Sequence, residues 1–276
     1  MRGSDLFVAG AAALLAGFVT LQVAAAPPGR PVSTAGGGLS EADSAAIAEY
    51  YYTNLQPVDR SLAPPAWLSD VHVARLRAAA ARALRAPDRP RDDAVVRAAI
   101  EADAPHGYIG AILAASDSLL ARWPAEASPI RVWVQPRSSA PGFTSAFVSP
   151  VRASFLTWND VGLGVEFALV DDSTQADVHV TWAQRLPGEG QIGNTLRITD
   201  SDGWVVAAHV VLATSYEIST VQNAALHEVG HVLGLDHSPS HDDLMSATTN
   251  GRQYRLTPAD RNTARLLYTV PAGRVR

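Results

Sequence analysis

The spacing of hydrophobic and polar residues changes about halfway along the chain. In the first half an apolar residue recurs every three or four positions, at Val73, Leu76, Ala80 and Leu84, which predicts a helix with one apolar face. In the second half the stretch 130–135 alternates apolar and polar residues, which is typical of a strand with one buried face. The pattern therefore predicts a helical part followed by a part that contains a sheet.

The second part combines strands with helices. Further strands are predicted there at 164–170, 176–182, 194–199 and 204–213, with helices near 146–160, 220–233 and 257–268. Two more predicted helices, near 92–103 and 107–122, belong to the first part. Because strands alternate with helices and two of the strands form a hairpin, we expect an α/β (α+β) fold with a mixed sheet.

The N-terminus carries an uncharged apolar stretch, residues 6–26, with Arg2 just before it. This stretch is longer than the apolar part of a typical signal peptide, about 7–15 residues, and it reaches the roughly 20 residues that a membrane-spanning helix needs. The alanines at 24–26 favour a cleavage site instead. We therefore expect residues 1–26 to be a signal peptide or an N-terminal membrane anchor. Residues 6–26 contact the membrane if they are not cleaved, and the rest of the chain lies outside the cytoplasm.

Composition narrows the functions that the rest of the chain can have. The net charge is -5 and all 22 basic residues are arginine, which argues against a nucleic-acid partner. There is no cysteine, which excludes disulfides, thiolate metal sites and cysteine nucleophiles. Any metal must therefore be held by histidine and carboxylate side chains. Nothing in the composition sets the oligomeric state.

The informative segment runs from His227 to Ser238 and reads HEVGHVLGLDHS. On a helix, residues four apart share a face, so His227 and His231 can direct their imidazoles to one point. Gly234 can end the helix in a left-handed conformation and let the chain bring up His237 as a third ligand. Three histidines suit Zn²⁺ and leave its fourth position for water, as in catalytic zinc sites.

Glu228 lies next to the first of these histidines and is not needed for coordination. It is placed to accept the proton of a water molecule whose pKa the metal lowers, and to pass that proton to the departing amine of a peptide bond. The alternative interpretation is a surface helix with solvated histidines and a glycine cap.

This pattern resembles the signature of the metzincin metallopeptidases, and Gly230 and Ser238 resemble its matrixin branch. The family also carries a methionine on a tight turn beneath the zinc, a role that Met245 fits. The closing helix is similar to that of bacterial matrixin-like proteins. The resemblance implies a zincin-type catalytic domain, a five-stranded mixed sheet, and an antiparallel edge strand above the cleft, for which 194–199 is the candidate.

These observations divide the chain into four expected parts. They are a leader at 1–26, a flexible linker rich in Pro, Gly, Ser and Thr at 27–39, a helical accessory or pro-segment at 40–126, and a metzincin-like catalytic domain at 127–276. Family proenzymes are often inhibited by a cysteine on the zinc, which this chain lacks. If 40–126 restrains activity, it must act sterically or through a carboxylate or histidine.

Several other polar groups offer weaker hypotheses. Acidic loops at 171–177 and 200–203 suggest a calcium site, but each has few carboxylates for an ion that takes six to eight oxygens. His179 and His209 lie in strand patterns and are expected to be packing or surface residues. We read His241 as a solvated loop residue.

Two functions remain open at this stage. The first is a zinc-dependent endopeptidase of matrixin type that acts on proteins or peptides outside the cytoplasm. The second is a membrane-tethered envelope protein with a structural or vestigial zinc site, whose helical segment binds a partner. Glu228 favours the first, because a purely structural site does not require it.

Overall fold

The computed structural model describes residues 19–22, 69–70, 92–116, 119–199, 202–248 and 255–275. The expected linker at 27–39 and almost all of the helical pattern before residue 92 lie outside these ranges, as does most of the apolar stretch 6–26. Among the described residues, no helix is both long enough and apolar enough to cross a membrane.

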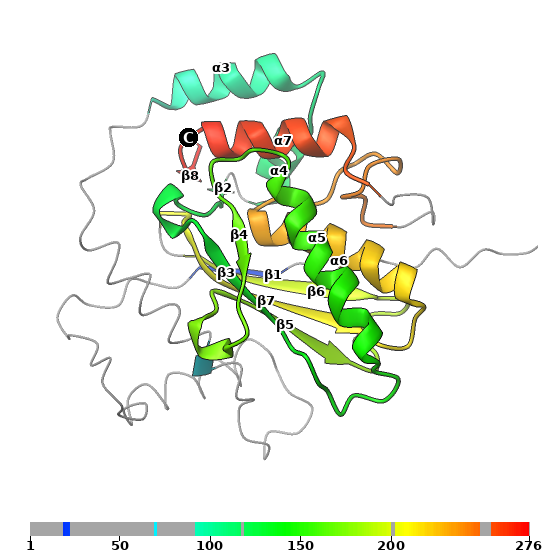
Figure 1. The fold of residues 1–276 in the computed structure, drawn as a ribbon. Helices are drawn as coiled ribbons and strands as arrows, with labels where there is room; N and C mark the ends of the chain where they lie inside the picture. The colour runs from blue at the N-terminus through cyan, green and yellow to red at the C-terminus, as the bar shows by residue number, and fades with distance from the viewer. Residues whose placement is uncertain are drawn as a thin grey trace, which may run out of the picture.

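The main sheet has six strands, and five of them form the mixed sheet that was expected (Figure 1). They are β3 (Ile130–Val134), β4 (Phe167–Leu169), β5 (Val178–Ala183), β6 (Gly193–Thr199) and β7 (Val205–Ala213). Their order in the sheet is β6-β7-β5-β3-β4. Strand β6 runs antiparallel to β7, whereas the other neighbours are parallel. In β3 the alternation seen in the sequence becomes an alternation of buried and half-buried side chains.

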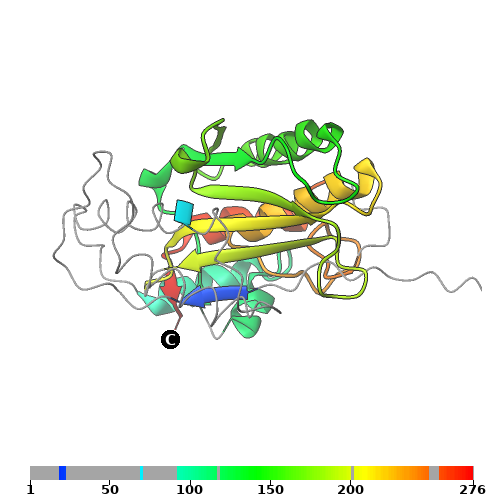
Figure 2. The same ribbon diagram turned by 90° about the horizontal axis from the view of Figure 1, so that it is seen from below.

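The outer side of β6 is not free, contrary to the expectation for residues 194–199. Strand β1 (Val19–Gln22) pairs with it in parallel, with Val19 opposite Leu196 and Gln22 opposite Thr199 (Figure 2). The prediction of an antiparallel strand was right, but its position at the edge of the sheet was wrong. The backbone N–H and C=O groups on the open side of a strand can pair with any extended segment. The sequence of 194–199 therefore does not show which segment lies beside it.

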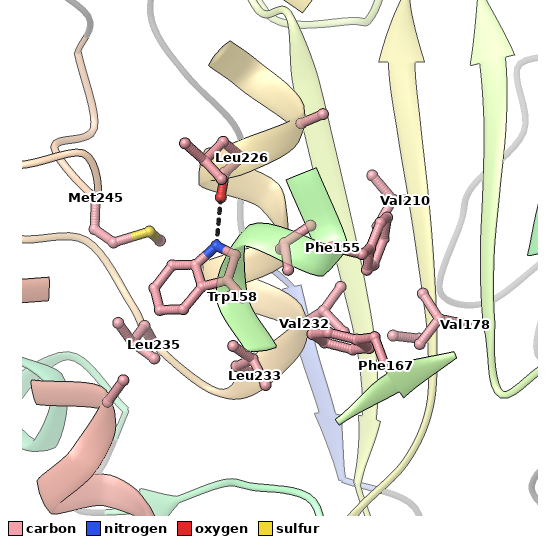
Figure 3. Packing of buried hydrophobic residues seen from close by; sticks show 14 of the residues in the cluster. Phe155, Trp158, Phe167, Val178, Val210, Leu226, Val232, Leu233, Leu235 and Met245 are labelled. Carbon is pink, nitrogen blue, oxygen red and sulfur yellow. Dashed lines mark hydrogen bonds between the residues drawn. The ribbon is translucent and has the colours of Figure 1, made fainter. Parts of the chain in front are cut away.

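Two long helices cover one face of the sheet side by side (Figure 1). Helix α5 (Val148–Asn159) packs on β3 and β4, and α6 (Ile218–Leu233) packs on β6 and β7. The Trp158 indole of α5 donates a hydrogen bond of 2.9 Å to the carbonyl oxygen of Leu226 in α6 (Figure 3). This bond fixes the two helices against each other over a core of apolar side chains.

The remaining elements pack against the other end of the core. They are α3 (Asp93–Asp103), α4 (Ile109–Ala115), β2 (Leu119–Leu120), α7 (Pro258–Thr269) and β8 (Gly273–Arg274). Helix α7 packs against α3 and α4, and β2 pairs antiparallel with β8. Short 3₁₀ helices lie at Ala125–Ala127, Ser145–Phe147 and Ser173–Gln175.

The helix expected at 107–122 is shorter than predicted. It ends at Ala115, where the hydroxyl of Ser116 lies 2.7 Å from the carbonyl oxygens of both Ile112 and Leu119. Residues 119–120 then form a strand because β8, far along the chain, supplies its partner. Side chains from both sides of residue 126 share one hydrophobic core, including Ile112, Trp123 and Leu233. The division at residue 126 itself stays a prediction.

Candidate metal centre

The structure brings together the three histidines of the HEVGHVLGLDH segment. Helix α6 carries His227 and His231 one turn apart, and Gly234 ends it with a φ of +113°. The reversed chain returns His237 to the same point. The Nε2 atoms of His227 and His231 are 3.0 Å apart, and those of His231 and His237 are 3.2 Å apart. Within the described part of the chain these three form the one cluster of at least three metal-binding side chains.

Backbone carbonyls set the tautomer of two of these rings. The Nδ1 of His227 lies 2.7 Å from the carbonyl oxygen of Leu244, and the Nδ1 of His231 lies 2.8 Å from that of Leu235. A carbonyl oxygen only accepts, so each Nδ1 carries the proton and each Nε2 presents a lone pair. Lone pairs at this distance repel unless a cation lies between them.

The donor set fits a zinc ion. Bonds of about 2.0–2.1 Å in a tetrahedral arrangement place neighbouring nitrogens about 3.3 Å apart, close to the observed separations. Zinc takes the neutral form of histidine, and burial favours that form here. Burial lowers the pKa of His227 to about 3 and lowers the pKa of His231 and of His237 as well. Three protein ligands leave one coordination position open.

Glu228 lies beside this cluster and is fully buried. Its Oε2 accepts a hydrogen bond of 2.6 Å from the hydroxyl of Thr195 on β6, and its Oε1 has no hydrogen-bond partner among the described residues. Burial raises the pKa of Glu228 to about 8, and the bond from Thr195 opposes that rise. At Gly193 a Cβ would come within 2.6 Å of the Glu228 side chain, so the strand passes close to the carboxyl only because it has glycine there.

Met245 lies directly beneath the helix that carries the histidines. It is fully buried, and its side chain points towards the ring of Trp158 (Figure 3). A Cβ at Gly230 would lie 2.9 Å from Cε of Met245 and 3.1 Å from Trp158, so this glycine lets the methionine approach the helix. Met245 thus lies in a turn that packs against the helix carrying His227 and His231.

A buried carboxylate on the last long helix supports this turn. Asp260 of α7 accepts hydrogen bonds from the backbone N–H groups of Leu244 (3.1 Å) and Met245 (3.3 Å) and from the hydroxyl of Tyr108 (2.9 Å). It also forms a capping box with Thr257. No local spacing in the sequence relates Asp260 to this turn.

A second carboxylate ties the turn to the third histidine. Asp243 accepts a hydrogen bond of 2.6 Å from the hydroxyl of Ser238, the residue after His237, and one of 2.8 Å from Thr257. The backbone N–H of Ser238 donates to the carbonyl oxygen of Met245 at 2.8 Å. Neither Asp243 nor Thr195 was singled out from the sequence, because no local spacing relates them to the histidines.

The acidic loop residues and the histidines outside the segment 227–237 have contacts away from the histidine cluster. Asp177 pairs with Arg131 at 2.7 Å, and Asp171 pairs with Arg152 at 3.2 Å. Asp172 caps a 3₁₀ helix. His179 and His209 are buried in the sheet, and His241 is exposed, as expected for each.

Comparison with known proteins agrees with the resemblance. Residues 137–269 match the matrixin family model. Metalloendoproteinase 1-MMP of Arabidopsis thaliana is 28% identical over 121 residues, which are 38% of this chain and 32% of that protein. Metalloendoproteinase 1 of Glycine max is 24% identical over 166 residues, which are 54% of this chain and 53% of that protein. The chain thus spans about a third and about half the length of these relatives. The predicted matrixin resemblance is confirmed over 137–269.

Proposed function

We propose that this chain, with its matrixin match over residues 137–269, is a zinc-dependent endopeptidase that hydrolyses peptide bonds of extracytoplasmic proteins or peptides. The observation that carries the proposal is the convergence of three histidine Nε2 atoms, from His227, His231 and His237, beside a buried glutamate. Both relatives named above are metalloendoproteinases, which supports the same activity. The extracytoplasmic location is supported by the uncharged apolar composition of residues 6–26, although Val19–Gln22 of that stretch pair with β6 in the structure.

In this proposal His227, His231 and His237 hold the zinc ion. When bound, zinc supplies Lewis acidity, which lowers the pKa of a water molecule and polarises the peptide carbonyl. The Nδ1 contacts to Leu244 and Leu235 keep two of the rings in the orientation that coordination requires.

Glu228 acts as the general base. Its Oε1, which has no partner among the described residues, accepts a proton from the attacking water, while Thr195 holds Oε2 at 2.6 Å. The carboxyl then donates this proton to the nitrogen of the leaving amine, so that the peptide bond breaks without a covalent intermediate. Burial raises the pKa of Glu228, and a carboxylate with a raised pKa is a stronger base than a free one, which favours proton transfer from water.

The test uses the full chain loaded with zinc and a library of quenched fluorescent peptides, with and without a chelator. Glu228→Ala is expected to lower kcat by at least about 10²-fold while elemental analysis still finds one zinc per chain. Glu166→Ala, which removes an exposed glutamate, is the control and should keep wild-type activity. Full activity in Glu228→Ala would refute the general base, and zinc without chelator-sensitive turnover would favour the structural or vestigial site.

A further inference from the structure

A buried arginine reaches from the sheet to the turn that carries the third histidine. Arg197 lies on β6, and its side chain is 2% exposed. Its Nη2 donates to Oδ1 of Asp236 at 2.9 Å. Its Nη1 donates to the carbonyl oxygens of His231 at 3.0 Å and of Leu235 at 3.2 Å. One guanidinium therefore bonds three residues in the short stretch 231–236.

These three acceptors lie in the stretch that runs from the second histidine of the cluster to the residue before the third. His231 contributes one of the converging Nε2 atoms. The carbonyl oxygen of Leu235 accepts from both Arg197 and the Nδ1 of His231, so it links the arginine to that ring. Asp236 directly precedes His237. The contacts of Arg197 thus fix the backbone on which the two rings depend.

Burying an ion pair here is a poor way to gain stability. The guanidinium and the Asp236 carboxylate both lose their hydration, and burial lowers the pKa of Arg197 against the opposing effect of Asp236. Apolar side chains of similar volume often stabilise a protein core as well as such a pair or better. The directional bonds supply what apolar packing cannot, which is a defined path for the chain between Gly234 and His237.

We propose that Arg197 is a positioning residue for the metal centre. Through Asp236 and the carbonyl oxygens of His231 and Leu235, it holds His237 at the distance from His231 that zinc coordination requires. The inference rests on the proposed zinc site and adds a determinant of zinc affinity that lies outside the three ligands. Loss of such a partner typically weakens metal binding by about 10–100-fold.

Arg131 provides a matched control on the same sheet. It lies on β3 and forms an ion pair with Asp177, with Nη2 2.7 Å from Oδ1 and Nε 2.9 Å from Oδ2. No hydrogen bond or ion pair of Arg131 that the structure describes reaches residues 227–237. Arg131→Met therefore removes a sheet arginine and its ion pair without touching the turn.

The experiment measures zinc affinity by competition with a chromogenic chelator, and the visible spectrum of the cobalt(II)-substituted protein, in the full chain. Arg197→Met is expected to weaken zinc binding by about 10–100-fold and to change the cobalt spectrum. Arg197→Lys, which keeps the charge but not the fork of donors, should fall between that variant and wild type. Arg131→Met should match wild type in both measurements.

Asp236→Asn keeps the inference testable if Arg197→Met does not fold. Circular dichroism establishes that the variant is folded, and its zinc affinity is expected to fall at least several-fold. Wild-type affinity and spectrum in a folded Arg197→Met or Asp236→Asn variant would overturn the inference, as would an equal change in Arg131→Met. A wild-type chain that binds no zinc would instead reject the proposed function, so the two failures are distinguishable.

Discussion

The indole Nε1 of Trp123 donates a hydrogen bond of 2.8 Å to the carbonyl oxygen of Val232. Trp123 precedes residues 137–269, which match the matrixin family, whereas Val232 is in the last turn of the helix that carries His227 and His231. That turn ends with carbonyl groups that have no partner within the helix, and Trp123 satisfies one of them. A residue from outside the matched region therefore helps to support the helix that carries His227 and His231.

This contact predicts where the chain can be shortened. A fragment that begins at Asp92 keeps α3, α4, β2 and Trp123, and we expect it to unfold cooperatively on heating. A fragment that begins at Ala127 exposes the core side chains that packed against this segment, so it should lack a cooperative transition. Circular dichroism during thermal unfolding checks both fragments. A cooperative transition in the shorter one would show that residues 92–126 are dispensable for the fold.

Tyr108 is expected to stabilise the turn beneath the metal centre through Asp260. Its hydroxyl donates to Oδ1 of Asp260 at 2.9 Å, and both residues are buried. Tyr108→Phe leaves this carboxyl short of one donor, which should lower the free energy of unfolding by about 1–3 kcal/mol. Urea denaturation measures the change. Tyr216→Phe is the control, because the Tyr216 hydroxyl has no hydrogen bond to the described residues, and an equal loss there would contradict the prediction.

Gly230→Ala tests the packing between the helix and Met245. The added Cβ would lie 2.9 Å from Cε of Met245 and 3.1 Å from Trp158, so the free energy of unfolding should fall by about 1–3 kcal/mol. Gly110→Ala is the control, because a Cβ at this helical glycine would meet no atom within 4 Å. It should raise the free energy of unfolding by about 0.5–1 kcal/mol.

Truncation of Met245 should relieve the collision. The double variant Gly230→Ala with Met245→Ala is expected to be more stable than the sum of the two single changes predicts, because the new methyl group fills part of the space that is left. Strict additivity in urea denaturation would show that the two positions do not meet.

His209 should make the fold sensitive to acid. Its Nε2 lies 2.8 Å from the hydroxyl of Thr181, and burial lowers the pKa of His209 to about 3, with His179 adding to the effect. The unfolded imidazole has a pKa of about 6.5, so below that pH the unfolded chain binds a proton that the folded chain does not. The free energy of unfolding therefore falls as the pH drops from about 6.5 towards 3, by up to about 1.4 kcal/mol per pH unit from this residue.

The measurement compares urea denaturation of metal-free wild type and His209→Gln between pH 6 and pH 4.5. The three clustered histidines, His227, His231 and His237, are present in both proteins, so the difference between the two slopes isolates His209. A shallower slope is expected in the variant. His106→Gln removes an exposed histidine and should keep the wild-type slope. Identical slopes for wild type and His209→Gln would contradict the assignment.

Local patterns in the sequence predicted those helices and strands that are determined by residues close together in the chain. The helix at 220–233 is observed at Ile218–Leu233, and Gly234 ends it in the left-handed conformation that only glycine adopts readily. Its start was less accurate. The helix begins two residues before the predicted start, and Glu217 occupies the cap position without a side-chain hydrogen bond there. Helix ends depend on the preceding chain, which a capping pattern does not describe.

Contacts between distant residues could not be predicted from local spacing. Asp260 meets Tyr108 across 152 positions, and Arg197 meets Asp236 across 39. A charged residue in an alternating strand normally lies on the solvent face. Arg197 points instead towards the end of α6, where carbonyl oxygens and the Asp236 carboxylate accept its hydrogen bonds. The strand at 119–120 likewise exists through its pairing with 273–274. The histidine cluster was foreseeable because helix geometry alone joins His227 to His231.

The backbone carbonyls that orient His227 and His231 also bear on how the protein acquires its ion. Those bonds leave each Nε2 unprotonated, so a metal ion that binds His227 and His231, in whichever compartment the chain meets it, displaces no proton from either ring. Imidazole ligands also bind cobalt, nickel and copper, and in the general order of affinity copper is held more tightly than zinc. The identity of the resident ion would then follow from which metals that compartment supplies.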